Sequence, residues 1–340
     1  MSNSERVLVT GTTGFVGLAI ASEALAQGFR VRATIRKPEQ EAEIRNLLRG
    51  IATEDNLEFA QADLLSDVGW VEAMQGCTYV IHAASPLIIG KVKDEKQLMG
   101  PAVDGTRRVL NAAKAAGVTR VVVTSTALTV VGHITQGVGG PNDYTPVDHP
   151  GNMLYTTSKI MAENVVRQFM KDNPDGPAIT TIHPGVIIGP PIRPDEDSES
   201  IALFRDVLER KQPAVPPIGY PMADVRDVAT VHVAAMSVTD RDNHRYLVSF
   251  TEEPQKVIDI ANVLRANGYP RAPKRQIPWP ILRVVALFNS EIAGIVKSVE
   301  GLSMKLDTSS TQRDLAWTPI TFEQSVIDTA RALSPTGKVL

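Results

Sequence analysis

Tyr155 and Lys159 are the pair in this sequence best suited to moving a proton. A spacing of four residues puts both side chains on one face of a helix. Reduction of a carbonyl needs a proton donor beside the oxygen that becomes an alkoxide. A phenol has a pKa of about 10, which a neighbouring ammonium group would lower. The pair therefore predicts proton transfer to a carbonyl oxygen, although an exposed Tyr and Lys on a surface helix would show the same spacing.

A glycine-rich segment near the start of the chain is typical of nucleotide binding. It runs from Thr10 to Gly17 with the spacing G-x-x-G-x-x-G, directly after a strand-like run and at the start of a helix-like one. Glycines allow a close approach of the backbone to a pyrophosphate, and the helix N-terminus favours an anion. A plain turn between strand and helix is the alternative. The cofactor-binding residues predicted here are Gly11, Thr13, Gly14, Phe15, Val16 and Gly17.

The end of the second strand-like run bears on the choice between NAD and NADP. NAD enzymes of this kind place an acidic residue there, but this sequence has Arg36 followed by Lys37. A guanidinium group binds a phosphate with two hydrogen bonds. The absent acid and the added bases together predict NADP(H), although a solvated basic strand end would account for either cation alone. Asp63, with Leu64, follows the third strand and is expected near the adenine; a helix N-cap is an equal alternative for Asp63.

The elements that would position these residues alternate along the first 183 residues. The apolar, β-branched runs predict strands, and the segments between them, such as 105–116, predict helices; the strands are expected at 7–10, 31–35, 57–60, 79–83, 120–124 and 179–182. This alternation implies βαβ units with right-handed crossovers. The expected fold class is α/β, a Rossmann-type doubly wound parallel sheet with a smaller, discontinuous C-terminal substrate lobe.

The pattern changes after Pro184, where proline becomes dense. Helices are expected at 201–209 and 224–238 and a further strand of the sheet at 245–250, so the chain should return to the sheet between two stretches of the lobe. We therefore predict a dinucleotide-binding domain of residues 1–183 and 224–250 and a substrate-binding lobe of residues 184–223 and 251–340. The apolar segment 279–296 contains charges and predicts an amphipathic helix in the core rather than a membrane span.

Composition narrows the class of protein further. The 340 residues are 43% hydrophobic and 21% charged, with a net charge of −3, which gives no electrostatic support for binding nucleic acid. The single cysteine, Cys77, excludes an intramolecular disulfide and favours a reducing compartment. Residues 1–6 run into a strand without an apolar leader. We expect a cytoplasmic protein without a membrane partner, present as a monomer or homodimer.

Several motifs together make the sequence similar to the extended short-chain dehydrogenase/reductases, in particular the group of dihydroflavonol reductases, cinnamoyl-CoA reductases and microbial aldehyde and ketone reductases. The resemblance covers the first 190 residues. It rests on the glycine segment, Val31-Arg32-Ala33-Thr34-Ile35-Arg36, His82-Ala83-Ala84-Ser85-Pro86, Thr124-Ser125-Thr126-Ala127, Tyr155 with Lys159, and His183-Pro184-Gly185 through Gly189-Pro190.

The resemblance implies further site residues. A third catalytic hydroxyl would hold the substrate carbonyl, and the family commonly reads T-S-S-A where this chain has Thr124-Ser125-Thr126-Ala127. Thr126 is therefore the expected catalytic hydroxyl and Ser125 the alternative. Thr124 is a candidate cofactor contact whose hydroxyl could instead cap the strand. The resemblance also implies cofactor contacts at Ala83, Ala84 and Ser85 and, on the nicotinamide side, at Pro184, Gly185 and Val186, with Lys159 on the ribose.

Other polar residues have weaker signals. His82 and His183 flank strand ends, but no carboxylate or cysteine shares a ligand-like spacing, so no metal site is predicted. His133, Asp143, Tyr144 and His149 fall in a segment that is variable and faces substrate in the family, and no role is assigned to them.

The leading interpretation is NADPH-dependent reduction of an aldehyde or ketone to an alcohol, with Tyr155 giving the proton, Lys159 tuning it and Thr126 holding the oxygen. A small carbonyl or alcohol is the expected partner. Two alternatives stay open: a nucleotide-sugar epimerase or dehydratase that retains NAD, and a non-catalytic NADP-binding sensor. The basic end of the second strand argues against the first, and the intact Tyr–Lys pair against the second.

Overall fold

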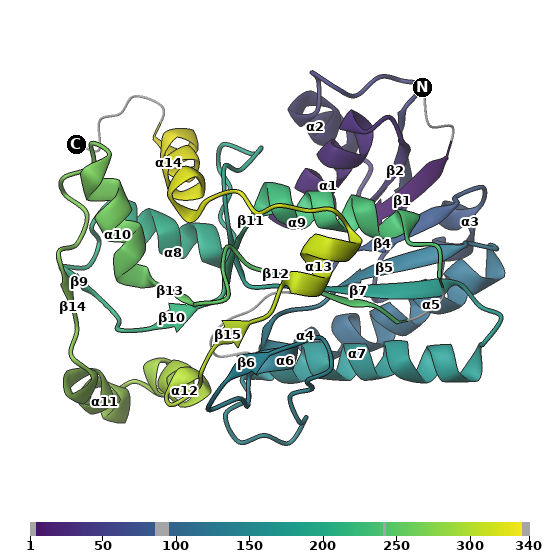
Figure 1. Ribbon diagram of the computed structural model, residues 1–340. Helices are drawn as coiled ribbons and strands as arrows, with labels where there is room; N and C mark the ends of the chain where they lie inside the picture. Colours follow the sequence, from purple (N-terminus) through teal and green to yellow (C-terminus); the bar gives the residue numbers. More distant parts are fainter. Residues whose placement is uncertain (1–4, 86–94, 241–242, 335–340) are drawn as a thin grey trace.

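The computed structural model describes residues 5–85, 95–240 and 243–334 and contains one seven-stranded parallel sheet. The sheet forms the right-hand part of the molecule in Figure 1. Its strands, in spatial order, are β12 (Arg245–Val248), β7 (Ala178–Pro184), β5 (Arg120–Thr124), β4 (Tyr79–His82), β1 (Arg6–Thr10), β2 (Arg30–Ile35) and β3 (Leu57–Gln61). The order reverses between β1 and β4, as in the doubly wound dinucleotide-binding folds. The predicted fold class is confirmed.

Alternate residues of the strands face opposite layers of helices. In β1, Val7 and Val9 join the apolar cluster beneath α1 (Phe15–Ala26) and α9 (Val225–Ala234), whereas Leu8 joins the cluster beneath α5 (Gly105–Ala115) and α7 (Leu154–Asp172). A strand buried on both faces needs this continuous run of apolar residues. Further elements of the sheet region are α2 (Gln40–Leu47), α3 (Trp70–Met74), α4 (Lys96–Met99), a π-helical turn (Gly100–Asp104), α6 (Leu128–Val131), β6 (Val138–Gly139) and a 3₁₀ turn (Ala235–Ser237).

The chain after β7 crosses to a second group of elements, on the left in Figure 1. Phe204, Leu264 and Val326 belong to one apolar cluster of this part, and Leu282, Val299 and Leu306 belong to a second cluster that also includes Val130 and Val131 of α6. Between residues 222 and 248 the chain returns to the sheet through α9 and β12. The elements of this part are β8 (Val186–Ile188), α8 (Glu199–Leu208), β9 (Ala214–Val215), β10 (Gly219–Tyr220), β11 (Met222–Asp224), β13 (Gln255–Lys256), α10 (Val257–Ala266), β14 (Arg275–Gln276), α11 (Trp279–Phe288), α12 (Ser290–Val299), β15 (Lys305–Leu306), α13 (Ser309–Asp314) and α14 (Phe322–Leu333).

The C-terminal segment does not stay within this second group. The Thr311 hydroxyl of α13 exchanges hydrogen bonds with the main chain of Leu247, at 2.9 and 2.8 Å, and Trp317 packs in the cluster beneath α1. This arrangement covers the edge strand β12, whose free N–H and C=O groups would otherwise be open to pairing with another chain.

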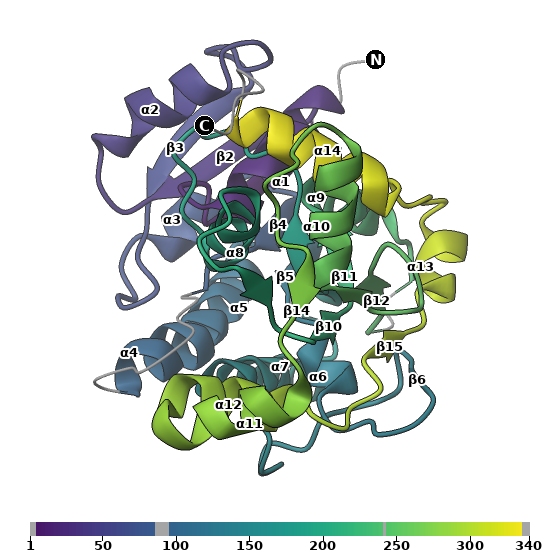
Figure 2. The ribbon, with the colours of Figure 1, turned by 90° about the vertical axis from the view of Figure 1, so that its left-hand side faces the viewer.

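The prediction of one amphipathic core helix over 279–296 is wrong. The segment forms two helices, α11 and α12, which pack on each other and meet at Asn289 (Figure 2). Leu282 of α11 is buried, but Leu287 and Phe288 are 79% and 86% exposed. No helix among residues 5–85, 95–240 and 243–334 is long and apolar enough to cross a membrane.

Candidate active site

The glycine segment forms the turn between β1 and α1. Its three glycines have different structural surroundings. Gly11 has a φ of +78°, and a Cβ there would lie 2.9 Å from the Ala84 nitrogen. A Cβ on Gly17 would lie 2.2 Å from the Gly11 oxygen, so Gly17 allows α1 to lie against the turn. A Cβ on Gly14 would meet only the Gly11 oxygen, at 3.5 Å, and Gly14 is exposed. Internal packing therefore does not require glycine at position 14, whereas the close approach of a ligand to the backbone would favour one.

The N-terminus of α1 is free to bind an anion. No side chain caps this helix and its first turn has no acidic residue. The first N–H groups of a helix have no partner within it, and they carry partial positive charge. Nearby, the Ser85 hydroxyl is buried without a hydrogen-bond partner among the described residues. An uncapped helix end, open space at Gly14 and an unpaired buried hydroxyl fit a dinucleotide whose pyrophosphate lies at this turn.

The end of β2 presents two cations. Arg36 and Lys37 are exposed, and their main-chain N–H groups both donate to Gln40 Oε1 at 3.0 Å. Within the described ranges no carboxylate pairs with either side chain. Both charges are therefore available to a phosphate group at this edge of the sheet.

The end of β3 forms a turn. Asp63 Oδ1 accepts from the Leu65 N–H at 2.9 Å, and the Asp63 carbonyl accepts from Trp70 Nε1 at 3.0 Å. The following helix begins only at Trp70, with Gly69 as its N-cap, so Asp63 caps a turn and not a helix. Leu64 packs against Gly105 at the start of α5.

The segment after β4 lies against the glycine turn. Ala84 N–H donates to the Thr10 hydroxyl at 3.0 Å, and Ala83 also lies beside Gly11. Ala84 and Ser85 line one small internal cavity together with Thr124, Ser125 and Lys159. Pro86, which belongs to the same family motif, lies outside the described residues.

Tyr155 and Lys159 lie one turn apart on α7 and contact the chain at the end of β5. The Thr126 hydroxyl lies beside the Tyr155 phenol and by itself lowers the pKa of that phenol, and Lys159 Nζ donates to the Thr124 carbonyl at 3.0 Å. Burial raises the pKa of Tyr155 to about 12 and lowers the pKa of Lys159 to about 8. Burial outweighs the lowering by Thr126, so the direction at Tyr155 is opposite to the one expected from a neighbouring ammonium group.

The two hydroxyls after β5 point to different neighbours. Ser125 is bound to buried groups, with Glu163 Oε2 and the Thr129 hydroxyl each at 3.4 Å, whereas Thr126 contacts Tyr155. This difference follows from the extended backbone, in which successive side chains point to opposite sides. Thr126 therefore shares a site with the phenol and Ser125 does not.

Other predicted cofactor residues contact the protein in ways the sequence did not indicate. The Thr124 hydroxyl is 2.8 Å from His232 Nε2 of α9, so only its carbonyl faces Lys159. The Pro184 carbonyl accepts from Ala127 N–H at 2.8 Å. A Cβ on Gly185 would lie 2.1 Å from the Pro221 oxygen, so the strand crossing itself requires this glycine. Val186 N–H donates to the same Pro221 oxygen at 2.8 Å.

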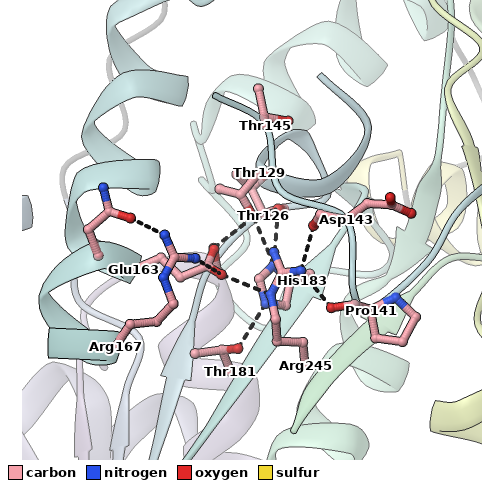
Figure 3. A network of polar contacts seen from close by, with 12 residues as sticks. Thr126, Thr129, Pro141, Asp143, Thr145, Glu163, Arg167, Thr181, His183 and Arg245 are labelled. Atoms are coloured by element: carbon pink, nitrogen blue, oxygen red, sulfur yellow. Dashed lines mark hydrogen bonds and ion pairs between the residues drawn. The ribbon is translucent and has the colours of Figure 1, made fainter. Parts of the chain in front are cut away.

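Figure 3 shows a buried polar network that connects Glu163, His183 and Arg245 close to Thr126. Arg245 Nε lies 2.8 Å from Glu163 Oε1, and both side chains are almost fully buried. Burial by itself would raise the pKa of the Glu163 carboxyl, but the nearby His183 and Arg245 hold it below its ordinary value. His183 Nδ1 is 2.9 Å from the Thr129 hydroxyl and 3.4 Å from the Thr126 carbonyl, and burial lowers the pKa of His183 to about 4.

Arg245 also fixes the loop that follows β6. Its Nη1 donates to the carbonyls of Pro141 and Asp143 at 2.7 and 2.6 Å (Figure 3). The guanidinium groups of Arg245 and Arg167 both lie over the Tyr144 ring, at 4.0 and 4.5 Å from its centroid. One buried arginine thus links the Thr126 segment to the loop in which the sequence placed possible substrate contacts.

The two strand-end histidines do not approach a common ligand. His82 contacts the hydroxyls of Thr10 and Thr106 at 2.9 and 3.4 Å, and burial lowers the pKa of His82 to about 3. In the part of the chain that the structure describes, no three His, Cys, Asp or Glu side chains gather as metal ligands would.

Sequence reasoning missed two features beside this site. One is the Glu163–Arg245 pair, which joins α7 to a strand distant in sequence. The other is Arg193, in the loop after β8, which contacts the glycine turn. Neither feature belongs to a local motif, and the one hint is that Glu163 stands among apolar residues of a helical pattern, where a buried carboxylate needs a partner.

The sheet order and the uncapped glycine turn define a Rossmann-type dinucleotide-binding protein. Residues 7–249 match the model of the NAD dependent epimerase/dehydratase family. An uncharacterised oxidoreductase of Schizosaccharomyces pombe is 34% identical over 76% of this chain and 81% of its own. A cinnamoyl-CoA reductase of Medicago truncatula is 28% identical over 76% of this chain and 80% of its own.

The fold comparison agrees. The yeast methylglyoxal/isovaleraldehyde reductase Gre2, solved with NADPH, superimposes with a TM-score of 0.79 at 20% identity over 96% of this chain and 98% of its own. The chain belongs to the NAD dependent epimerase/dehydratase family, whose members are extended short-chain dehydrogenase/reductases, and it is an oxidoreductase.

Proposed function

We propose that this oxidoreductase uses NADPH to reduce an aldehyde or ketone to an alcohol, reversibly. The observation that carries the proposal is the proximity of the Tyr155 phenol and the Thr126 hydroxyl, which lie where α7 meets the end of β5. A substrate carbonyl oxygen placed between these two hydroxyls would accept a hydrogen bond from each.

Each of the three polar residues has a distinct role in the proposal. With its pKa raised to about 12, Tyr155 is protonated at neutral pH and can donate its proton to the developing alkoxide. Thr126 holds and polarises the same oxygen. Lys159, one helical turn from Tyr155 and bound to the Thr124 carbonyl, supplies positive charge to the site and a donor for the cofactor ribose. The bound cofactor supplies the hydride.

NADP(H) is the proposed cofactor because the end of β2 carries two unpaired cations and no acid. We propose that Arg36 and Lys37 bind the 2′-phosphate, since a bidentate guanidinium suits a phosphate. The related yeast reductase was solved with NADPH, which supports the same choice. The other proposed cofactor contacts are Gly11, Thr13, Gly14, Phe15, Val16, Gly17, Asp63, Leu64, Ala83, Ala84, Ser85, Thr124, Lys159, Pro184, Gly185 and Val186.

We also propose that residues 184–223 and 251–340 supply most of the substrate pocket, and that residues 1–183 and 224–250 hold the cofactor. A small carbonyl compound or alcohol is the inferred substrate class. The cinnamoyl-CoA reductase and the aldehyde reductase among the similar proteins support reduction of a carbonyl group. We infer a cytoplasmic enzyme that is a monomer or homodimer.

The test is NADPH oxidation by the purified protein against a panel of aldehydes and ketones. We expect turnover of part of the panel, and Tyr155→Phe should reduce kcat by about 100- to 10,000-fold. NADPH binding, followed by nicotinamide fluorescence, should be unchanged in this variant. Turnover that survives Tyr155→Phe would refute the assigned role. Purification with tightly bound NAD and conversion of a nucleotide sugar would instead identify an epimerase or dehydratase, and cofactor binding without any turnover would identify a sensor.

A further inference from the structure

Arg193 lies across the glycine turn, although it comes from the loop between β8 and α8. Its Nη2 is 3.4 Å from the Thr13 carbonyl, and its Nη1 forms an ion pair with Glu43 of α2. The arginine side chain is only 18% exposed. A cation from the part of the chain after β7 is therefore held over the entrance to the dinucleotide site.

The partners of Arg193 place it beside both expected phosphate positions. Thr13 belongs to the turn at the N-terminus of α1, where the pyrophosphate is expected. Glu43 belongs to the helix that follows Arg36 and Lys37, where the 2′-phosphate is expected. The guanidinium group thus lies between these two ends of the site.

The ion pair with Glu43 is suited to being exchanged. The Glu43 side chain is half exposed, and a pair open to water on one side contributes little to stability. A phosphate offers a guanidinium group two strong hydrogen bonds and a larger negative charge. Glu43, in contrast, would repel a phosphate at this position unless a cation lay between them.

We propose that Arg193 is a phosphate ligand of the bound dinucleotide, and that it exchanges Glu43 for that phosphate when the cofactor enters. The inference rests on the proposed use of NADP(H). It adds a phosphate ligand that lies outside the glycine turn and the end of β2. It also means that cofactor binding fixes the loop between β8 and α8, which belongs to the proposed substrate lobe.

Two variants that break the same ion pair test the proposal. Arg193→Ala and Glu43→Gln both remove the Arg193–Glu43 ion pair. Any loss of cofactor affinity that is due to this ion pair alone must therefore appear in both variants. Dissociation constants for NADPH and for NADH are measured by nicotinamide fluorescence, and folding is compared by thermal unfolding. We expect Arg193→Ala to weaken NADPH binding about 10- to 100-fold. Glu43→Gln should bind NADPH as tightly as the wild type or a few fold more tightly.

The comparison between cofactors identifies the phosphate. A loss specific to NADPH assigns Arg193 to the 2′-phosphate, whereas an equal loss for NADPH and NADH assigns it to the pyrophosphate. Arg193→Lys should lose part of the affinity because it keeps the charge without the bidentate geometry. Equal losses of affinity in Arg193→Ala and Glu43→Gln, or an Arg193→Ala affinity within twofold of the wild type for both cofactors, would overturn the proposal. A wild-type protein that binds no NADPH would refute the proposed function instead.

Discussion

Replacing Glu163 by glutamine should destabilise the protein strongly, because it leaves a buried cation without its counter-charge. Arg245 Nε and Glu163 Oε1 are 2.8 Å apart, and the two side chains are 2% and 4% exposed. Removing one partner of a buried ion pair costs about 3–5 kcal/mol. Arg245 keeps two carbonyl acceptors and the Tyr144 ring, so we expect the lower value, about 3 kcal/mol. Domains commonly have only about 5–15 kcal/mol of stability in total.

The pH dependence gives a second measure of the same interaction. The folded-state pKa of Glu163 lies below its ordinary value, so the unfolded chain binds the proton more tightly. The stability from the ionised carboxylate is fully present above the ordinary glutamate pKa of about 4.3 and is lost as pH falls through the folded-state value. The difference between wild type and Glu163→Gln should therefore shrink below about pH 4.

The assay is urea unfolding followed by circular dichroism at pH 7.5 and at several values below 5. The matched control is Glu41→Gln, which removes a partly exposed partner of Arg45 on α2 and should cost less than about 0.5 kcal/mol. A loss for Glu163→Gln no larger than that of the control, or a difference that does not change with pH, would refute the reasoning.

Three further outcomes concern the catalytic and cofactor residues. Thr126→Ala should lower kcat by about 100-fold or more while Thr126→Ser and Ser125→Ala retain most activity, and steady-state kinetics on one carbonyl substrate decides between the two hydroxyls. Carbonyl reduction should decline as pH rises through about 8, where Lys159 loses its proton, and Lys159→Arg should move that decline to higher pH in a pH–rate profile. Gly14→Ala should weaken NADPH binding with little change in melting temperature. Gly17→Ala should lower the melting temperature, because only a Cβ at position 17 collides with the turn. Equal effects of the two substitutions would contradict this distinction.

Much of the sheet could be predicted because its strands carry their own signal. The run of Val7, Leu8 and Val9 is apolar at every position, and the structure buries it between two layers of helices. The segment 279–296 could not be predicted in the same way. Its apolar residues have helical spacing, but spacing does not tell whether the face they form meets the protein or the solvent. The break at Asn289 also depends on how α12 folds back on α11.

In the candidate site, too, local motifs could be predicted from the sequence and long-range contacts could not. Tyr155 with Lys159 and the glycine turn are local patterns, in which a few neighbouring residues define both the structure and the chemistry. Arg193 and Thr13 are 180 residues apart, and their contact depends on how the loop after β8 returns over the turn. The sequence also could not show that Lys159 binds a main-chain carbonyl, or that burial raises the pKa of Tyr155.

The packing of α9 on α1 has a consequence for synthesis of the chain. Leu18 and Ala21 of α1 are buried in a cluster with Val228 and Val231 of α9, which are translated some 200 residues later, or about 10–40 s at ordinary rates of elongation. During that time the part of the α1 surface that packs against α9 has no native cover and is open to aggregation or to a chaperone. We expect fragments that end before residue 225 to be insoluble even though they contain the glycine turn, Tyr155 and Lys159. A nascent chain can therefore complete its cofactor site only after α9 has been synthesised, well after the last motif residue of that site has been translated.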